Sequence, residues 1–133
     1  DFDTNFAFGK ASSEVEKVYE VLWQATEIGI NAAIPGATTF DVFNAMNKVI
    51  SEVSVAGNNV GRLGHGLGLQ LTEPPSHRDE DKTVIKENMV LTIEPGLEYA
   101  PGKMIVHEEN IIINKDGAEL ITKRAPKEIP IIN

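Results

Sequence analysis

Acidic and imidazole side chains occur in four short segments where glycine, proline or strand-like alternation restricts the backbone. The segments are Asp1-Phe2-Asp3, Gly64-His65-Gly66-Leu67-Gly68, Thr92-Ile93-Glu94-Pro95-Gly96 and His107-Glu108-Glu109-Asn110. An imidazole and several carboxylates on separate strands form an oxygen and nitrogen ligand set that suits Mn, Fe, Co or Zn. Carboxylates can also bridge two ions, and such a pair activates water as a nucleophile. The residue types therefore predict a hydrolytic metal centre.

Each of these residues also has a plainer structural interpretation. A lone histidine such as His65 at a strand end is more often a hydrogen-bonded structural residue than a ligand. Glu94 ends the apolar run of residues 89–93, and because an unpaired buried charge is costly it needs a cation, a metal or solvent. Strand alternation sends Glu108 and Glu109 to opposite faces, so we expect one to point inward and the other to be solvated.

The first half of the chain has helical periodicity. Ser13-x-x-Glu16 has the form of a capping box, which satisfies free backbone N–H groups at a helix start. Apolar residues then recur at helical spacing until Pro35-Gly36, which predicts one amphipathic helix. Thr38-x-x-Asp41 predicts the start of a second helix, closed by Gly57-Asn58-Asn59. Its expected buried face consists of Phe43, Met46, Ile50 and Val53.

After residue 60 the periodicity changes to that of a strand. Leu67, Leu69 and Leu71 alternate with smaller or polar residues, which predicts a half-buried strand. Pro74-Pro75 and the charged residues 77–82 then predict an exposed loop.

The last third of the chain contains further strand signals. Residues 89–93 predict a short buried strand that ends at a proline. Residues 104–114 and 118–122 flank Lys115-Asp116-Gly117, which predicts a hairpin because glycine readily adopts positive φ. Two helices followed by mainly antiparallel strands predict an α+β fold.

Length and composition indicate one globular domain. The chain has 133 residues, 41% hydrophobic and 24% charged, which is near the usual size and balance of a single domain. A formal net charge of -8 argues against general binding to nucleic acid or to an anionic membrane surface. No apolar run approaches the ~20 residues of a membrane helix and no secretory signal is visible, so the cytoplasm is the expected compartment. The lack of cysteine excludes thiolate ligands and cysteine nucleophiles.

Three motifs in order resemble those of one enzyme family. The motifs are Gly-His-Gly-Leu-Gly at residues 64–68, Thr-Ile-Glu-Pro-Gly at residues 92–96 and Val-His-Glu-Glu-Asn-Ile-Ile-Ile at residues 106–113. They resemble the pita-bread metallohydrolases, which include methionine aminopeptidases, aminopeptidase P, prolidases and creatinase. Residues 1–9 are similar to the family segment in which an Asp precedes Thr-Arg-Thr-Phe, and Ile34-Pro35-Gly36 fits its loop between helices. The resemblance covers essentially the whole chain.

The resemblance implies a fold and a set of ligands. It implies that residues 1–133 form the C-terminal half of a pita-bread domain, with two helices packed on a mainly antiparallel sheet. It implies four metal ligands, Asp1, His65, Glu94 and Glu108. They would hold two divalent ions, with manganese, iron, cobalt and zinc as the candidates, and His65 and Glu94 would act directly in catalysis. Glu108 is preferred to Glu109 because it aligns with the acid of the family motif.

Three departures from the family pattern affect this expectation. Thr72 stands where the peptidases carry a second histidine, and a hydroxyl cannot replace an imidazole as a proton carrier. His77 is the nearest alternative, but a solvated position is more common in a charged loop, so Thr72 and His77 are weak candidates for substrate binding. Asp3-Thr4-Asn5 replaces Thr-Arg-Thr, which alters the surroundings that orient Asp1. A further family ligand lies upstream of the residue that matches Asp1, so we expect the native protein to contain a preceding N-terminal half.

The leading functional interpretation is a metal-dependent hydrolase of the Xaa-Pro peptidase type, in which a metal-bridging hydroxide attacks a peptide carbonyl. An alternative is a pita-bread enzyme that acts on another small molecule, similar to dimethylsulfoniopropionate lyases or creatinase. A third is a catalytically silent binding module, against which the retained ligand residues count. We expect the full-length protein to be a homodimer, and the 133-residue chain alone to be inactive.

Overall fold

The computed structural model describes residue 1, residues 3–53 and residues 61–133. Two helices lie in the first half of the chain. α1 (Ser13–Ala32) begins where the Ser12 hydroxyl accepts a hydrogen bond from the backbone N–H of Val15. α2 (Thr39–Ser51) begins with a capping box formed by Thr38 and Asp41. Both predicted helices are confirmed, and the cap of the first is Ser12. The predicted end of the second, Gly57-Asn58-Asn59, lies outside the described residues.

Each helix buries one stripe of side chains. The buried residues are Val18, Tyr19, Leu22, Ala25, Thr26 and Gly29 in α1, and Thr39, Val42, Met46 and Ile50 in α2. A Cβ at Gly29 would lie 2.6 Å from Sδ of Met46 and 2.8 Å from Cγ2 of Ile93, so glycine permits the close approach of these elements. Val53, which we expected on the buried face, lies beyond the end of α2 and is 47% exposed.

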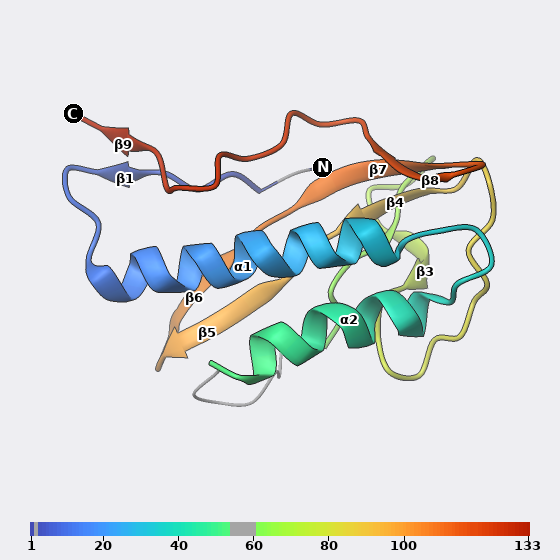
Figure 1. The fold of residues 1–133 in the computed structure, drawn as a ribbon, viewed down its shortest axis with the longest axis horizontal. Helices are drawn as coiled ribbons and strands as arrows, with labels where there is room; N and C mark the ends of the chain where they lie inside the picture. The colour runs from blue at the N-terminus through green and yellow to red at the C-terminus, as the bar shows by residue number, and fades with distance from the viewer. Residues whose placement is uncertain (2, 54–60) are drawn as a thin grey trace.

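The described residues contain nine short strands. They are β1 (Ala7–Phe8), β2 (His65–Gly66), β3 (Glu73–Ser76), β4 (Val90–Ile93), β5 (Gly96–Ala100), β6 (Lys103–Val106), β7 (Glu109–Asn114), β8 (Gly117–Leu120) and β9 (Ile131–Ile132). The central sheet has the order β3-β2-β4-β7-β8, and its neighbouring strands are antiparallel. β5 pairs with β6 in the antiparallel sense, and β1 pairs with β9 in the parallel sense. Figure 1 shows α1 and α2 side by side over the strands.

The region between β2 and β4 differs from the sequence prediction. Leu69 and Leu71 are exposed and residues 67–72 form no strand, because their alternation occurs in a surface segment. Pro74-Pro75, which we expected in an exposed loop, instead lies within β3. The expected strand of residues 89–93 is confirmed as β4.

The C-terminal strands are confirmed with one change. The apolar stretch of residues 104–114 is two strands, β6 and β7, which are separated at His107-Glu108. The hairpin at Lys115-Asp116-Gly117 joins β7 to β8, and Gly117 has a φ of +141°. A turn of this kind favours glycine because side chains rarely adopt positive φ.

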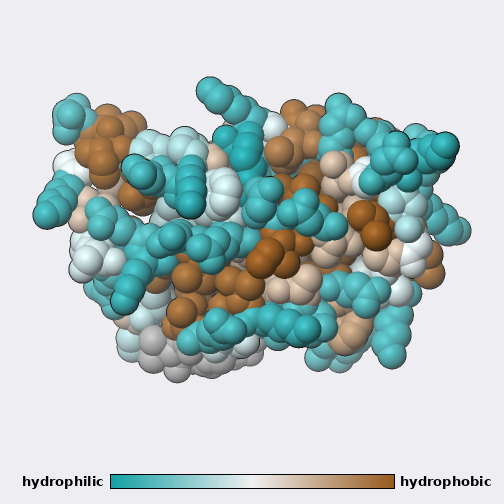
Figure 2. Space-filling view, in the orientation of Figure 1, coloured by the Kyte–Doolittle hydropathy of each residue, from teal (hydrophilic) through white to brown (hydrophobic). Residues whose placement is uncertain are grey.

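The hydrophobic core lies between the helices and the central sheet, as an α+β layer requires. Its fully buried members include Leu22, Met46, Ile50, Leu91, Ile93, Ile111 and Ile113. Figure 2 shows that polar side chains cover much of the helical face, with apolar patches between them. One patch lies over the β1 and β9 pair, where Phe8 is 78% exposed and Ile131 is 47% exposed. No described helix is both long and apolar enough to cross a membrane.

Candidate metal centre

Three adjacent strands of the central sheet bring the predicted ligands to one place. His65 begins β2, Glu94 directly follows β4 and Glu108 directly precedes β7. β4 pairs with both β2 and β7, and Ile93 lies opposite Glu109 in that register. Because the strands are antiparallel, the next pair along this register places Glu94 beside Glu108. The backbone N–H of Glu94 also donates to the carbonyl of Leu63 at 2.9 Å, which joins the end of β4 to the segment before His65.

The backbone around His65 fixes the direction of its imidazole. Gly64 has a φ of +137°, and a Cβ at this position would lie 2.2 Å from the carbonyl oxygen of Thr92, so only glycine fits. The N–H of His65 donates to the Thr92 hydroxyl oxygen at 3.0 Å. Nδ1 of His65 lies 2.8 Å from the carbonyl oxygen of Gly66. Because a carbonyl can only accept, Nδ1 carries the proton and Nε2 presents its lone pair to the site.

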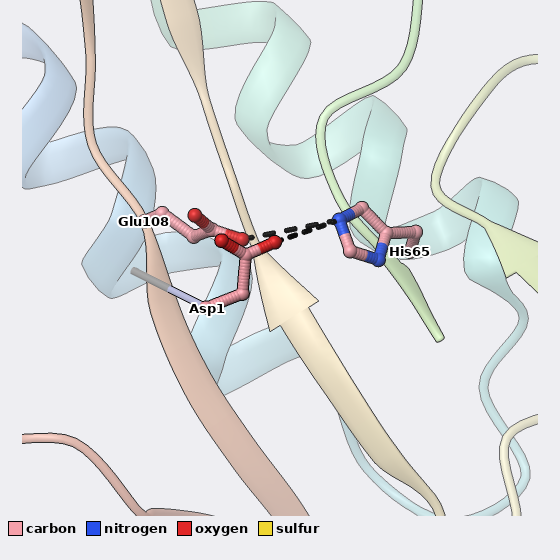
Figure 3. Close-up of side chains that lie close together, drawn as sticks. All are labelled: Asp1, His65 and Glu108. Atoms are coloured by element: carbon pink, nitrogen blue, oxygen red, sulfur yellow. Dashed lines mark ion pairs between the residues drawn. The ribbon is translucent and has the colours of Figure 1, made fainter. Parts of the chain in front are cut away.

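Three carboxylates surround that nitrogen, two of which are drawn with it in Figure 3. Nε2 of His65 lies 3.5 Å from Oε2 of Glu94, 3.8 Å from Oδ2 of Asp1 and 3.9 Å from Oε1 of Glu108. Two donor atoms that each lie about 2.1 Å from one ion at a tetrahedral angle are about 3.4 Å apart. Each carboxylate oxygen therefore lies at about the distance from Nε2 of His65 that two ligands of one cation have.

A second group of ligand atoms lies beside the first. Asp1, His65 and Glu108 form one set, and Asp3, Glu94 and Glu108 form another, with the ligand atoms of each set within 4.8 Å of one another. Glu108 belongs to both sets, as a carboxylate that bridges two ions would. Our sequence analysis placed Asp3 only in the surroundings of Asp1. The alternation of Asp1 and Asp3 along an extended segment was the available signal for a second acid on the same side.

Buried oxygen atoms without partners indicate that this cluster is suited to a cation. Glu108 is 3% exposed, and neither its Oε1 nor Oε2 of Glu94 receives a hydrogen bond from the described residues. Burial first, and then the charges of Glu94 and Asp3, raise the pKa of Glu108 to about 7, against the opposing positive charges of the N-terminus and Arg62. An ionised carboxylate in this environment is costly unless a positive charge accompanies it. The donor set and its unsatisfied atoms fit a divalent metal.

Glu109, which we expected to be solvated, is instead buried and fully hydrogen bonded. It is 3% exposed and accepts hydrogen bonds from the Thr122 hydroxyl, from the backbone N–H of Ala125 at 2.8 Å and from Nη1 of Arg124 at 3.3 Å. The guanidinium of Arg124 lies over the ring of Trp23, 4.5 Å from its centroid. Glu109 therefore attaches the C-terminal segment to β7, and Arg124 and Ala125 of that segment in turn contact Trp23 of α1.

Comparison with known proteins decides the family. The family model described as metallopeptidase family M24 matches residues 1–115. The chain belongs to metallopeptidase family M24. Its α+β fold is accordingly the C-terminal half of a pita-bread domain, as the sequence motifs implied.

Several Xaa-Pro dipeptidases are similar M24 relatives. The Xaa-Pro dipeptidase of Pyrococcus furiosus is 33% identical over 124 residues, which are 92% of this chain and 35% of that protein. The Xaa-Pro dipeptidase of Lactobacillus delbrueckii subsp. lactis is 32% identical over 99% of this chain and 36% of its own length. The crystal structure of a dipeptidase from Pyrococcus horikoshii superposes with a TM-score of 0.89 at 30% identity, covering 98% of this chain and 36% of that one. The chain thus spans about a third of the length of these relatives.

The two weak candidates for substrate binding in this M24 chain lie in different environments. Thr72 is exposed. His77, which we expected to be solvated, is 0% exposed. It is buried because its segment pairs with the residues just before β2, where its backbone N–H donates to the carbonyl of Gly64 at 2.9 Å. Burial lowers the pKa of His77 to about 4, so its ring is neutral at pH 7. The solvated position that we expected for His77 is therefore wrong, whereas the weak assignment of Thr72 and His77 to substrate binding stays a prediction.

A third histidine of this chain, His107, also lies next to the site but faces the core. It is 1% exposed, and its ring meets that of Tyr19 edge to face, with centroids 4.6 Å apart and planes at 74°. Burial and, to a smaller extent, the positive charge of Arg124 lower the pKa of His107 to about 4. His107 thus packs against α1 while Glu108, the next residue, faces the carboxylate cluster.

Proposed function

We propose that the complete protein is a metal-dependent peptidase that cleaves Xaa-Pro dipeptides or the N-terminal residue before proline in short peptides. The observation that carries the proposal is the convergence of Nε2 of His65 with the carboxylates of Asp1, Glu94 and Glu108 at 3.5–3.9 Å. The Xaa-Pro dipeptidase relatives support the substrate class. The catalytic domain of the complete protein is proposed to extend beyond these 133 residues, because the chain spans about a third of the length of the Xaa-Pro dipeptidase relatives.

The metal ligands are proposed to be Asp1, His65, Glu94 and Glu108, with Glu108 shared between two ions. When bound, the ions would supply an activated hydroxide as the nucleophile and stabilise the charge that develops on the carbonyl oxygen. Manganese is the metal to test first, and iron, cobalt and zinc are the alternatives, because the donor set contains only oxygen and nitrogen.

The residues of the chain itself position this chemistry. The carbonyl of Gly66 holds the proton of His65 on Nδ1, so Nε2 stays available as a ligand. Glu94 lies half-buried at the end of β4, where its free oxygen faces Nε2 of His65 and where it can accept a proton from the attacking water. Thr72 is exposed at the position of the family's second histidine. We therefore propose that another group stabilises the tetrahedral intermediate at that side of the site.

A silent binding module explains the site less well. Such a module has no need for Oε1 of Glu108 and Oε2 of Glu94 to be buried without a hydrogen-bond donor. The absence of a partner among the described residues is costly in a merely structural cluster, whereas a metal ion removes that cost.

The test is hydrolysis by the complete protein of Xaa-Pro dipeptides and matched Xaa-Ala dipeptides, before and after treatment with a chelator. Turnover of the Xaa-Pro series that a chelator abolishes and Mn²⁺ restores supports the proposal. His65→Ala should reduce kcat/KM by more than the ~10–100-fold typical for loss of a group that only supports a metal ligand. Glu87→Gln, a change at an exposed residue, is the control. Stoichiometric metal binding without cleavage of either series would refute the peptidase assignment.

The proposal retains the remaining expectations from the sequence. The complete protein is expected to be a homodimer in the cytoplasm. The 133-residue chain alone is expected to be inactive, because the site needs the further ligand that the family carries upstream. Activity of the isolated chain at the level of the complete protein would contradict this expectation.

A further inference from the structure

Asp3 lies in the carboxylate cluster although the related family motif has threonine at this position. The carboxylate of Asp3 forms a set with those of Glu94 and Glu108, with one oxygen of each within 4.8 Å of the others. A threonine hydroxyl could only form hydrogen bonds there, whereas Asp3 adds a full negative charge. This chain therefore has one carboxylate more than the family pattern requires.

The position of Asp3 is held by the backbone next to it. The N–H of Glu108 donates to the carbonyl oxygen of Asp3 at 3.3 Å, so the segment of Asp3 runs beside the residue that precedes β7. Both Asp1 and Asp3 form sets with Glu108, which means that their side chains face the same buried carboxylate. Asp3 is thus placed against the site by main-chain contact as well as by its own side chain.

The buried oxygens facing Asp3 distinguish this group from ordinary surface acids. Glu108 is only 3% exposed, and its Oε1 receives no hydrogen bond from any described residue. Oε2 of Glu94 is in the same state. Three carboxylates at this spacing repel one another, and each repulsion is relieved if one cation lies between them.

We propose that Asp3 is a direct ligand of the second metal position, together with Glu94 and Glu108. This inference rests on the proposed metal centre and adds a ligand that the family motif does not supply. The two positions then differ in chemistry: the first contains the imidazole of His65, and the second contains oxygen only. Oxygen ligands suit Mn²⁺, whereas a mixed set with imidazole also suits zinc and iron. The second position is therefore selective for harder cations.

The test is titration of the metal-free complete protein with Mn²⁺, followed by calorimetry and by the metal content after dialysis. Asp3→Asn preserves the size of the side chain and removes its charge, and Asp3→Thr restores the residue of the family motif. Both should weaken the lower-affinity binding event by more than the ~10–100-fold typical of groups that only support a ligand. The higher-affinity event, assigned to the set with His65, should change by less than about threefold. Asp79→Asn, an equal charge change at an exposed residue, should leave both events unchanged.

The outcomes separate this inference from the proposed function. If the wild-type protein binds two ions and both Asp3 variants bind them as tightly as wild type, Asp3 is not a ligand while the metal centre stands. If the wild type binds no ion, the metal centre itself is refuted. Repeating the titration in 0.5 M salt distinguishes a ligand from a long-range charge, because salt screens the second and not the first. An effect of Asp3→Asn that disappears in high salt would overturn the assignment.

Discussion

Glu108 and Glu109 are consecutive buried carboxylates with opposite surroundings. Glu109 accepts hydrogen bonds from three donors, whereas Oε1 of Glu108 accepts none from the described residues. The two residues lie at the start of β7 and are both 3% exposed. One carboxylate is therefore satisfied by the protein, and the other is suited to a ligand.

Glu109→Gln should destabilise the protein without removing the metal. Loss of the charge weakens the bonds from Thr122, Arg124 and Ala125, so the free energy of unfolding should fall by about 1–3 kcal/mol. Urea unfolding of the metal-free protein measures this change. Metal stoichiometry should stay as in wild type. An unchanged unfolding free energy would show that Glu109 does not hold the C-terminal segment to β7.

Glu108→Gln should have the reverse effect. Because the substitution removes an unpaired buried charge, the metal-free protein at pH 8 should be at least as stable as wild type. Affinity for Mn²⁺ should fall by more than the ~10–100-fold typical of groups that only support a ligand. Thermal unfolding with and without Mn²⁺ tests both expectations. A variant that is destabilised and still binds metal like wild type would contradict the role of Glu108.

Gly64→Ala should be more harmful than the same change at another positive-φ glycine that has no close neighbour. A Cβ at Gly64 would lie 2.2 Å from the carbonyl oxygen of Thr92, whereas a Cβ at Gly36, with a φ of +92°, has no neighbour within 4 Å. Gly36→Ala should cost about 1–2 kcal/mol from φ alone. Gly64→Ala should cost more and should displace His65 and lower metal affinity. Equal losses in the two variants would indicate that the contact with Thr92 has no role.

The stability of the metal-free protein should fall below neutral pH because of His77. Burial lowers the pKa of His77 from 6.5 to about 4 in the folded protein. A lowered folded pKa gives stability that is present above about pH 6.5 and is lost as the pH falls towards 4, since the unfolded chain takes up the proton first. At pH 5 the lowered pKa of His77 still contributes about 1–2 kcal/mol to the free energy of unfolding.

His77→Leu tests this pH dependence. The variant removes the titrating group and fills a similar volume, so its unfolding free energy should decline less than that of wild type between pH 7.5 and pH 5. His107, whose pKa is also lowered to about 4, remains in both proteins and serves as an internal reference. Parallel pH profiles for wild type and variant would show that His77 does not contribute.

The helices could be predicted because they depend on local signals, whereas the ligand positions came from the resemblance of the sequence motifs to the pita-bread family. Capping at Thr38 and Asp41, apolar spacing, and glycine beside His65 are all visible in neighbouring residues. Antiparallel pairing then places strand ends together, which brought Glu94 and Glu108 to His65.

The failures have a common physical cause in contacts made far along the chain. Leu69 and Leu71 alternate as a strand would, yet nothing covers them, and both are exposed. His77 lies in a charged segment, yet pairing with Gly64 buries it. Glu109 is satisfied by groups 13 to 16 residues away, which periodicity cannot reveal.

The most direct test of the metal centre is anomalous diffraction from crystals of the complete protein grown with Mn²⁺. The account predicts a manganese peak about 2.0–2.3 Å from Nε2 of His65 and in contact with the carboxylates of Asp1 and Glu108. A second peak is predicted among Asp3, Glu94 and Glu108. A fully occupied manganese site elsewhere, with no peak at Nε2 of His65, would contradict the account.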